Sequence, residues 1–129
     1  LNTRQIAFLL AVARTESGFN PDAAARTSSA AGLGQFIDAT GSAYGIKESK
    51  RFDLQSNVSA MISYLRSCLK QAAVKNSQAN EAQIYTLAYG LYHDGPSLNY
   101  GGMEVARQNV LPWIDRYASW LDNQPVTGP

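Results

Sequence analysis

The chain has 129 residues with a formal net charge of +1, and it holds one cysteine and one histidine. This length suits one domain around one core, and 45% hydrophobic with 16% charged residues excludes a disordered chain. The near-zero charge argues against a nucleic-acid partner, and a lone Cys68 excludes an internal disulfide and, with a single His93, argues against a zinc site.

The first helix is predicted over residues 3–17. Asn2 and Gln5 are placed as a reciprocal capping pair, and Gly18 is placed as the stop signal. The apolar positions follow the i, i+3, i+4, i+7 spacing of one helix face, with Ile6, Leu9, Leu10 and Ala13. The apolar run here, residues 6–13, is the longest in the chain and is too short for a membrane span.

The middle of the chain is predicted to hold a loop and two helices. Residues 20–31 are small, polar and turn-prone, which indicates an anchored loop, and a short helix is expected over residues 35–44, closed by Gly45. The strongest periodic run predicts a central core helix, with Asp53 near its start. Its apolar stripe is Val58, Met61, Ile62, Leu65, Cys68, Leu69 and Ala72.

Two more helices are predicted towards the C-terminus, one around residues 84–91 and one that begins at Pro112. No stretch alternates with a period of two for long, so the sequence predicts an all-α fold of about six helices. The chain starts at Leu1 and ends on QPVTGP, a linker-like composition. We therefore expect a folded unit over residues 1–122 and a linker-like tail at 123–129, taken from a longer protein.

Glu16 is the candidate for chemistry in the first helix. On a helical wheel it lies about 20° from Leu9 and about 40° from Val12, on the apolar face. A carboxyl group there is partly desolvated, which raises its pKa and lets it donate a proton near neutral pH. The alternative is that the helix frays at this end and Glu16 points into water.

Four short motifs occur in a fixed order around and after Glu16. Residues 16–21 read ESGFNP and residues 30–37 read AAGLGQFI, followed by AT at 39–40 and YG at 44–45. Residues 52–57 read FDLQSN, with YL at 64–65, and residues 91–96 read LYHDGP; a looser LP at 111–112 precedes Tyr117. This pattern resembles the soluble lytic transglycosylase family, which has ES-x-FNP, GA-x-GLMQ, FDP-x-x-N and AYNAGP in this order.

The resemblance implies a small lysozyme-like, or goose-lysozyme-like, all-α domain with an active-site groove, here over residues 1–122. It implies a peptidoglycan lytic transglycosylase that cleaves the β-1,4 bond between N-acetylmuramic acid and N-acetylglucosamine. Glu16 matches the single catalytic glutamate, which acts as acid and then as base to form a 1,6-anhydro product. Neither a cofactor nor a metal ion is implied.

The resemblance also implies substrate-binding residues. Ser17 matches the serine whose hydroxyl reaches the sugar N-acetyl group, although a helix-end hydrogen bond is equally compatible with its place. Gln35 matches the glutamine that lines the groove beside the cleaved bond, and Tyr92 matches the tyrosine of AYN. Tyr117 matches a later tyrosine that hydrogen-bonds near the catalytic carboxylate, or it is a core aromatic.

Three positions depart from the family pattern and lie at the expected groove. Gly34 and Ile37 stand where the family has methionines, which changes the shape of the groove. His93 replaces the Asn of AYN, so it is expected to contact sugar, to perturb Glu16, or to mark a phage-type subfamily. An exposed loop histidine is the remaining interpretation.

Two other functions stay open at this point. A hydrolytic muramidase of the goose-lysozyme kind needs a base for water, for which Asp38, Asp53 and Asp94 are candidates. A weakly active peptidoglycan-binding module of a larger phage, secretion or pilus assembly is the other. In each case the expected partner is a peptidoglycan glycan strand, and the expected location is the periplasm, the cell envelope or a phage virion.

Overall fold

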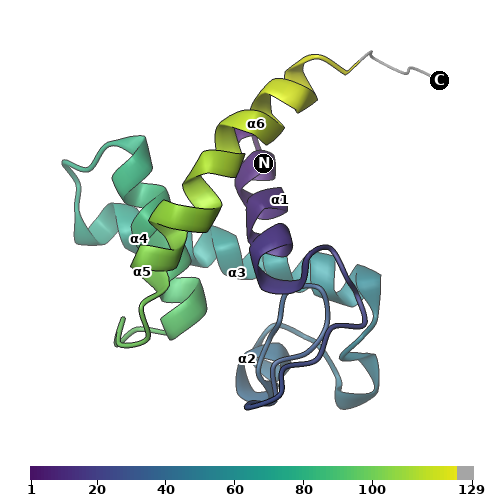
Figure 1. The fold of residues 1–129 in the computed structure, drawn as a ribbon. Coiled ribbons are helices and arrows are strands. Elements are labelled where there is room, and N and C mark those ends of the chain that lie inside the picture. The colour runs from purple at the N-terminus through teal and green to yellow at the C-terminus, as the bar shows by residue number, and fades with distance from the viewer. Residues whose placement is uncertain (125–129) are drawn as a thin grey trace.

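A computed structural model describes residues 1–124, which form a helical fold around one core (Figure 1). The described residues contain no strand, only isolated bridges from Ala31 to Ala24 and to Phe36. The all-α prediction is therefore confirmed. In chain order the elements are α1 (Thr3–Ser17), α2 (Asp38–Ala43), the 3-10 turn η1 (Glu48–Lys50), α3 (Leu54–Lys75), α4 (Glu81–Asp94), α5 (Gly102–Val105), the π-helical turn η2 (Ala106–Val110) and α6 (Leu111–Asp122).

Helix α1 has the predicted bounds because both of its ends are set by local chemistry. The Asn2 side chain accepts from the Gln5 backbone N–H at 2.8 Å, and Gln5 accepts from Asn2 N–H at 3.0 Å. Gly18 ends the helix in the left-handed region, with φ of 59°. The helix packs against α6, α3 and η2. Its most buried residues are Ala7, Phe8, Ala11 and Val12, whereas Ile6, Leu9 and Leu10 of the predicted stripe are only half-buried, so the buried face is not the predicted one.

The helix predicted over residues 35–44 starts later, because α2 begins at Asp38. Gln35 has a left-handed backbone, with φ of 53°, which no helix accommodates. The residues before it fold back on themselves, and Ala31 N–H donates to Phe36 O at 3.2 Å. The loop at 20–31 is anchored as expected, since Gly32 N–H donates to Ala23 O at 2.8 Å.

Helix α3 is the predicted central helix, and it fastens this loop to the core. Asp53 caps its first turn by accepting from Ser56 N–H at 2.9 Å. The fully buried Asn57 accepts from Gly34 N–H at 3.1 Å and donates to Arg51 O and to Asp53 O, both at 3.0 Å. One amide therefore satisfies backbone groups of three residues, one in the loop before α2 and two between η1 and α3.

Arg51 and Cys68 complete the surroundings of α3. The buried Arg51 guanidinium donates to the Asp38 carboxylate and to the carbonyls of Ser29 and Phe36, so η1 and α2 are tied to the loop. Cys68 lies on the buried stripe of α3, where burial raises the pKa of its thiol to about 12. This agrees with its predicted place in the core.

The C-terminal part holds two elements that the sequence pattern did not predict. Gly101, with φ of 76°, leads into α5, and η2 continues the chain into α6, which carries Pro112 in its first turn. Figure 1 shows α6 crossing α1, and shows the C-terminal end of α1 at the loops that carry α2. The predicted tail at 123–129 falls mostly on residues 125–129, which lie outside the described residues.

Within residues 1–124, no helix has both the length and the apolar character that crossing a bilayer requires.

Replacing Asn57 by Ala should destabilise the fold by roughly 2–4 kcal/mol, because the Gly34 N–H and the Arg51 carbonyl lose their buried partner. Urea unfolding followed by circular dichroism measures this loss. Ser59→Ala, at an exposed position of the same helix, is the matched control and should stay within about 0.5 kcal/mol of wild type. Equal effects of the two variants would contradict the role given to Asn57.

Candidate active site

Glu16 lies in the last turn of α1 and is partly buried, not frayed into water. The hydroxyl of Tyr89, a buried residue of α4, donates to Glu16 Oε1 at 2.5 Å. Burial raises the pKa of Glu16 above its ordinary value, and the Tyr89 hydrogen bond and the charge of His93 offset part of that rise. The carboxyl group is therefore suited to hold a proton and to release it.

A cavity of about 130 Å³ lies between the loop before α2, α3 and the end of α4. Four of the six predicted substrate-binding residues line it, namely Gln35, Ile37, Tyr92 and His93. Tyr89 connects this cavity to Glu16, because its ring lies 6.2 Å from that of Tyr92 and 5.8 Å from that of His93. Four of the predicted residues are thus brought to one cavity, and Tyr89 is the contact between its walls and the Glu16 carboxyl group.

Tyr92 forms the floor of the cavity, and Gly34 lies against its hydroxyl group. The Tyr92 hydroxyl donates to Gly34 O at 2.6 Å. A side chain at position 34 would start within 2.8 Å of Met61 and Tyr92 and 2.7 Å from Phe36, so only glycine fits. Met61 of α3 occupies the space that a side chain at position 34 would need.

Gln35 presents one end of its amide to the cavity. Its Nε2 donates to Ala23 O at 3.0 Å and to Gly32 O at 2.9 Å, so both amide hydrogens are used by the loop itself. The Oε1 atom is therefore the group left to bind a substrate donor. Ile37, which is 46% exposed, precedes α2 at the edge of the same cavity.

Ser17 and Tyr117 have other contacts than those implied by the resemblance. The Ser17 hydroxyl donates to Ala13 O at 3.0 Å, which is the helix-end hydrogen bond considered as the alternative. Tyr117 packs edge-on against Phe19, with ring centres 6.2 Å apart, and against Trp113 at 5.4 Å. Among the described residues, the hydrogen bond to Glu16 comes from Tyr89 and not from Tyr117.

Sequence reasoning missed Tyr89, although a signal for it was present. Tyr89 lies four residues before His93 on the same helix, so the two share a face. Its place next to a motif residue would have marked it as a candidate. Only the fold shows that this face meets the end of α1.

The three aspartates considered as hydrolytic bases each bind another group. Asp38 pairs with Arg51, and Asp53 accepts from the Ser56 N–H and hydroxyl. Asp94, with a side chain only 1% exposed, bonds to His93 Nδ1 at 2.5 Å and accepts from Gly102 N–H at 3.0 Å. Over residues 1–124 there is no group of three or more His, Cys, Asp or Glu side chains arranged to hold a metal ion.

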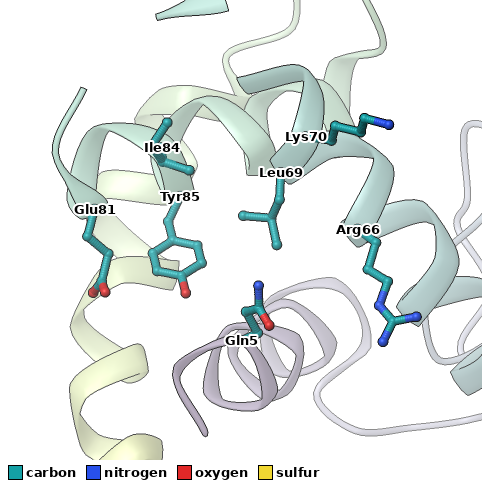
Figure 2. Close-up of a pocket in the computed structure, with 7 residues that line it drawn as sticks. All are labelled: Gln5, Arg66, Leu69, Lys70, Glu81, Ile84 and Tyr85. Carbon is teal, nitrogen blue, oxygen red and sulfur yellow. The ribbon is translucent and has the colours of Figure 1, made fainter. Parts of the chain in front are cut away.

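A larger, open pocket of about 420 Å³ lies at the other end of α1, between α1, α3 and α4 (Figure 2). Figure 2 shows Gln5 directed towards Leu69, and Lys70 directed away from the pocket. The carboxylate here, Glu81, is paired with Arg4 at 2.5 Å. None of the predicted site residues lies in it, so the candidate site is the smaller cavity beside Glu16.

A family model described as the transglycosylase SLT domain matches residues 2–97. This range runs from α1 through α4 and includes Glu16, Gln35, Tyr89 and His93, whereas α5, η2 and α6 lie outside it. No match was found among curated proteins or among solved structures.

Replacing Tyr89 by Phe should raise the pKa of Glu16 further, because the hydrogen bond that stabilises its carboxylate form is lost. The measurement is a pH titration of the Glu16 carboxyl carbon by NMR in a glutamate-labelled sample. Tyr117→Phe is the control and should leave the titration unchanged. A changed pKa of Glu16 in Tyr117→Phe, or an unchanged pKa in Tyr89→Phe, would contradict the assignment of this hydrogen bond to Tyr89.

Replacing Glu16 by Gln should stabilise the fold at alkaline pH. Since the folded state raises the pKa of Glu16, its favourable contribution is present at low pH and is lost as the pH rises through the folded-state pKa. The Tm of Glu16→Gln should therefore exceed that of wild type at pH 8, and the gap should shrink at pH 4. The exposed Glu48→Gln is the control, and a gap that does not vary with pH would refute the buried-carboxyl argument.

Proposed function

Because the chain belongs to the transglycosylase SLT family, we propose that it is a peptidoglycan lytic transglycosylase with Glu16 as its single catalytic group. The family has a lysozyme-like fold, in agreement with the all-α domain seen here, and it indicates an enzyme that cleaves the glycan of peptidoglycan. The finer proposal is cleavage between N-acetylmuramic acid and N-acetylglucosamine. The observation that carries it is the partly buried Glu16, hydrogen-bonded to Tyr89 beside a cavity.

In the proposed reaction Glu16 acts twice. As a carboxylic acid it protonates the bridging oxygen while the bond from that oxygen to C1 of the muramic acid breaks. As a carboxylate it then accepts the proton of the C6 hydroxyl of the same sugar, whose oxygen bonds to C1 and closes the 1,6-anhydro ring. Water is not consumed, and Glu16 ends the cycle protonated, as it began.

Tyr89 supports both states of the carboxyl group. Its hydroxyl binds Oε1, and no hydrogen bond within residues 1–124 reaches the other oxygen, which is left to carry the proton. The same bond stabilises the carboxylate after the proton has left. Tyr89 is therefore proposed as a positioning residue for Glu16.

The cavity supplies the proposed substrate contacts. We assign sugar binding to Gln35, Ile37 and His93 at its walls, with Tyr92 holding its floor. Ser17 lies next to Glu16, and its oxygen keeps lone pairs free to accept a donor from the N-acetyl group. Tyr117 packs against Phe19 and Trp113 and does not line the cavity, so we assign it a contact with a longer glycan outside the cavity.

The hydrogen bonds and ion pair made by Asp38, Asp53 and Asp94 favour a lyase over a hydrolytic muramidase. A hydrolase needs a second group to activate water. Asp38, Asp53 and Asp94 are each held by another partner, so a free carboxylate is lacking among these three candidates. Since the substrate is the cell wall, the proposed place of action is the periplasm or cell envelope, or a phage virion, within a larger protein or assembly.

The test is mass spectrometry of the soluble products that the chain releases from purified peptidoglycan. We expect products one water lighter than reducing muropeptides, and a fall in their release of roughly 10²- to 10⁴-fold in Glu16→Gln. Glu48→Gln, an exposed glutamate with the same chemical change, should release products at the wild-type rate.

Two other results would overturn the proposal in different ways. Reducing-end products would identify a hydrolase and direct attention back to the aspartates. If the chain sediments with peptidoglycan sacculi but releases nothing, it is a glycan-binding module with the fold of the family.

A further inference from the structure

The single histidine of the chain is held by a buried carboxylate. His93 Nδ1 lies 2.5 Å from Asp94 Oδ1, and the Asp94 side chain is 1% exposed. Although burial raises the pKa of Asp94, the hydrogen bonds from His93 and from the backbone of Tyr100 and Gly102 hold it below its ordinary value. Asp94 is thus a fixed anion whose remaining partners are backbone N–H groups.

This anchor decides which ring nitrogen of His93 is free. A carboxylate accepts hydrogen bonds and donates none, so Nδ1 carries the hydrogen of the neutral ring. The lone pair is then on Nε2, on the far side of the ring. The His93 side chain is 32% exposed and lines the cavity, and no hydrogen bond within residues 1–124 uses Nε2.

The charged and titratable groups around His93 come from three helices. Asp94, Tyr89 and Tyr92 belong to its own helix, Tyr64 of α3 lines the same cavity, and Glu16 of α1 is near enough for the charge of His93 to lower its pKa. The wall on the α2 side carries no ionisable side chain, being formed by Gln35, Phe36, Ile37 and Thr40. Asp94, whose carboxylate is bonded to His93 and to backbone N–H groups, is thus the one acidic side chain among the residues that line the cavity.

We propose that His93, held by Asp94, binds the glycan through Nε2 in its neutral form, accepting a hydrogen bond from a hydroxyl or acetamido N–H of the sugar that lies over this cavity. The proposal deepens the proposed function, on which it rests for the choice of a glycan as ligand. It assigns His93 as a specificity residue at a position where the resembling family has asparagine. An amide there both donates and accepts at every pH, whereas an imidazole loses its acceptor when it is protonated.

The pH dependence follows by linkage. If the neutral ring binds the sugar, binding must lower the pKa of His93, and affinity must be full above the free-state pKa and fall as the pH drops through it. A fall of one unit on binding corresponds to about tenfold weaker affinity of the protonated form. The sign is opposite if the protonated ring donates to the sugar.

The experiment is a pH titration of His93 by NMR in Glu16→Gln, which binds without cleaving. Because the chain has one histidine, one Cε1–H resonance reports on it. The probe is the β-1,4-linked tetramer of N-acetylglucosamine, with its Kd measured at pH 8 and pH 5. We expect the pKa of His93 to fall on binding and the tetramer to bind several-fold more weakly at pH 5.

Two variants in the same background serve as controls. His93→Asn should bind the tetramer with a Kd that does not change between pH 5 and pH 8. Asp94→Asn, which keeps an acceptor for the Gly102 N–H but loses the charge that fixes Nδ1–H, should show a weaker pH dependence. If that variant unfolds, the titration and His93→Asn still decide the matter.

Three results would overturn the proposal, namely an unchanged pKa of His93 with the tetramer bound, a raised pKa, and no binding of the tetramer at any pH. Each can occur whether or not the wild-type chain releases anhydro products. Product analysis of the wild type therefore judges the proposed function separately.

Discussion

The hydrogen bond between Tyr89 and Glu16 is the contact on which the site depends. A carboxyl group placed between two helices loses much of its hydration, and without a partner its burial opposes folding. Tyr89 supplies that partner from α4, so the groups on α4 and the end of α1 keep a fixed relation. Tyr92 and His93, which line the cavity, follow Tyr89 on the same helix.

A second constraint holds the opposite wall. The loop before α2 has little regular structure, yet it carries Gln35 in a strained left-handed backbone. Two side chains bind its backbone groups, Asn57 of α3 bonding to Gly34, and Arg51, which follows η1, bonding to Ser29 and Phe36. Gln35 keeps this strained backbone because the polar contacts hold the loop in one conformation. Its side-chain amide is thereby held in one orientation.

The sequence predicted best what local chemistry decides. The bounds of α1 follow from a capping pair and a glycine, so they could be read from neighbouring residues. The start of α2 could not be predicted in this way, because the backbone of Gln35 is fixed by contacts with residues distant in the sequence. Tyr89 and Glu16 are 73 residues apart in the sequence, and neither a motif nor a helical periodicity predicts a contact between residues so far apart. Glu16 was predictable from its place about 40° from Val12, which is buried, although the buried face of α1 as a whole is not the predicted one.

The burial of Cys68 has a practical consequence for work on this protein. Its thiol is the only one in the chain, and with a pKa raised to about 12 it carries almost no thiolate at neutral pH. A thiol-reactive dye can reach it only when α3 separates from the core. The rate of labelling therefore measures how often the native state opens, and no engineered cysteine is needed. Folded molecules also do not form intermolecular disulfides through this sulfur during storage.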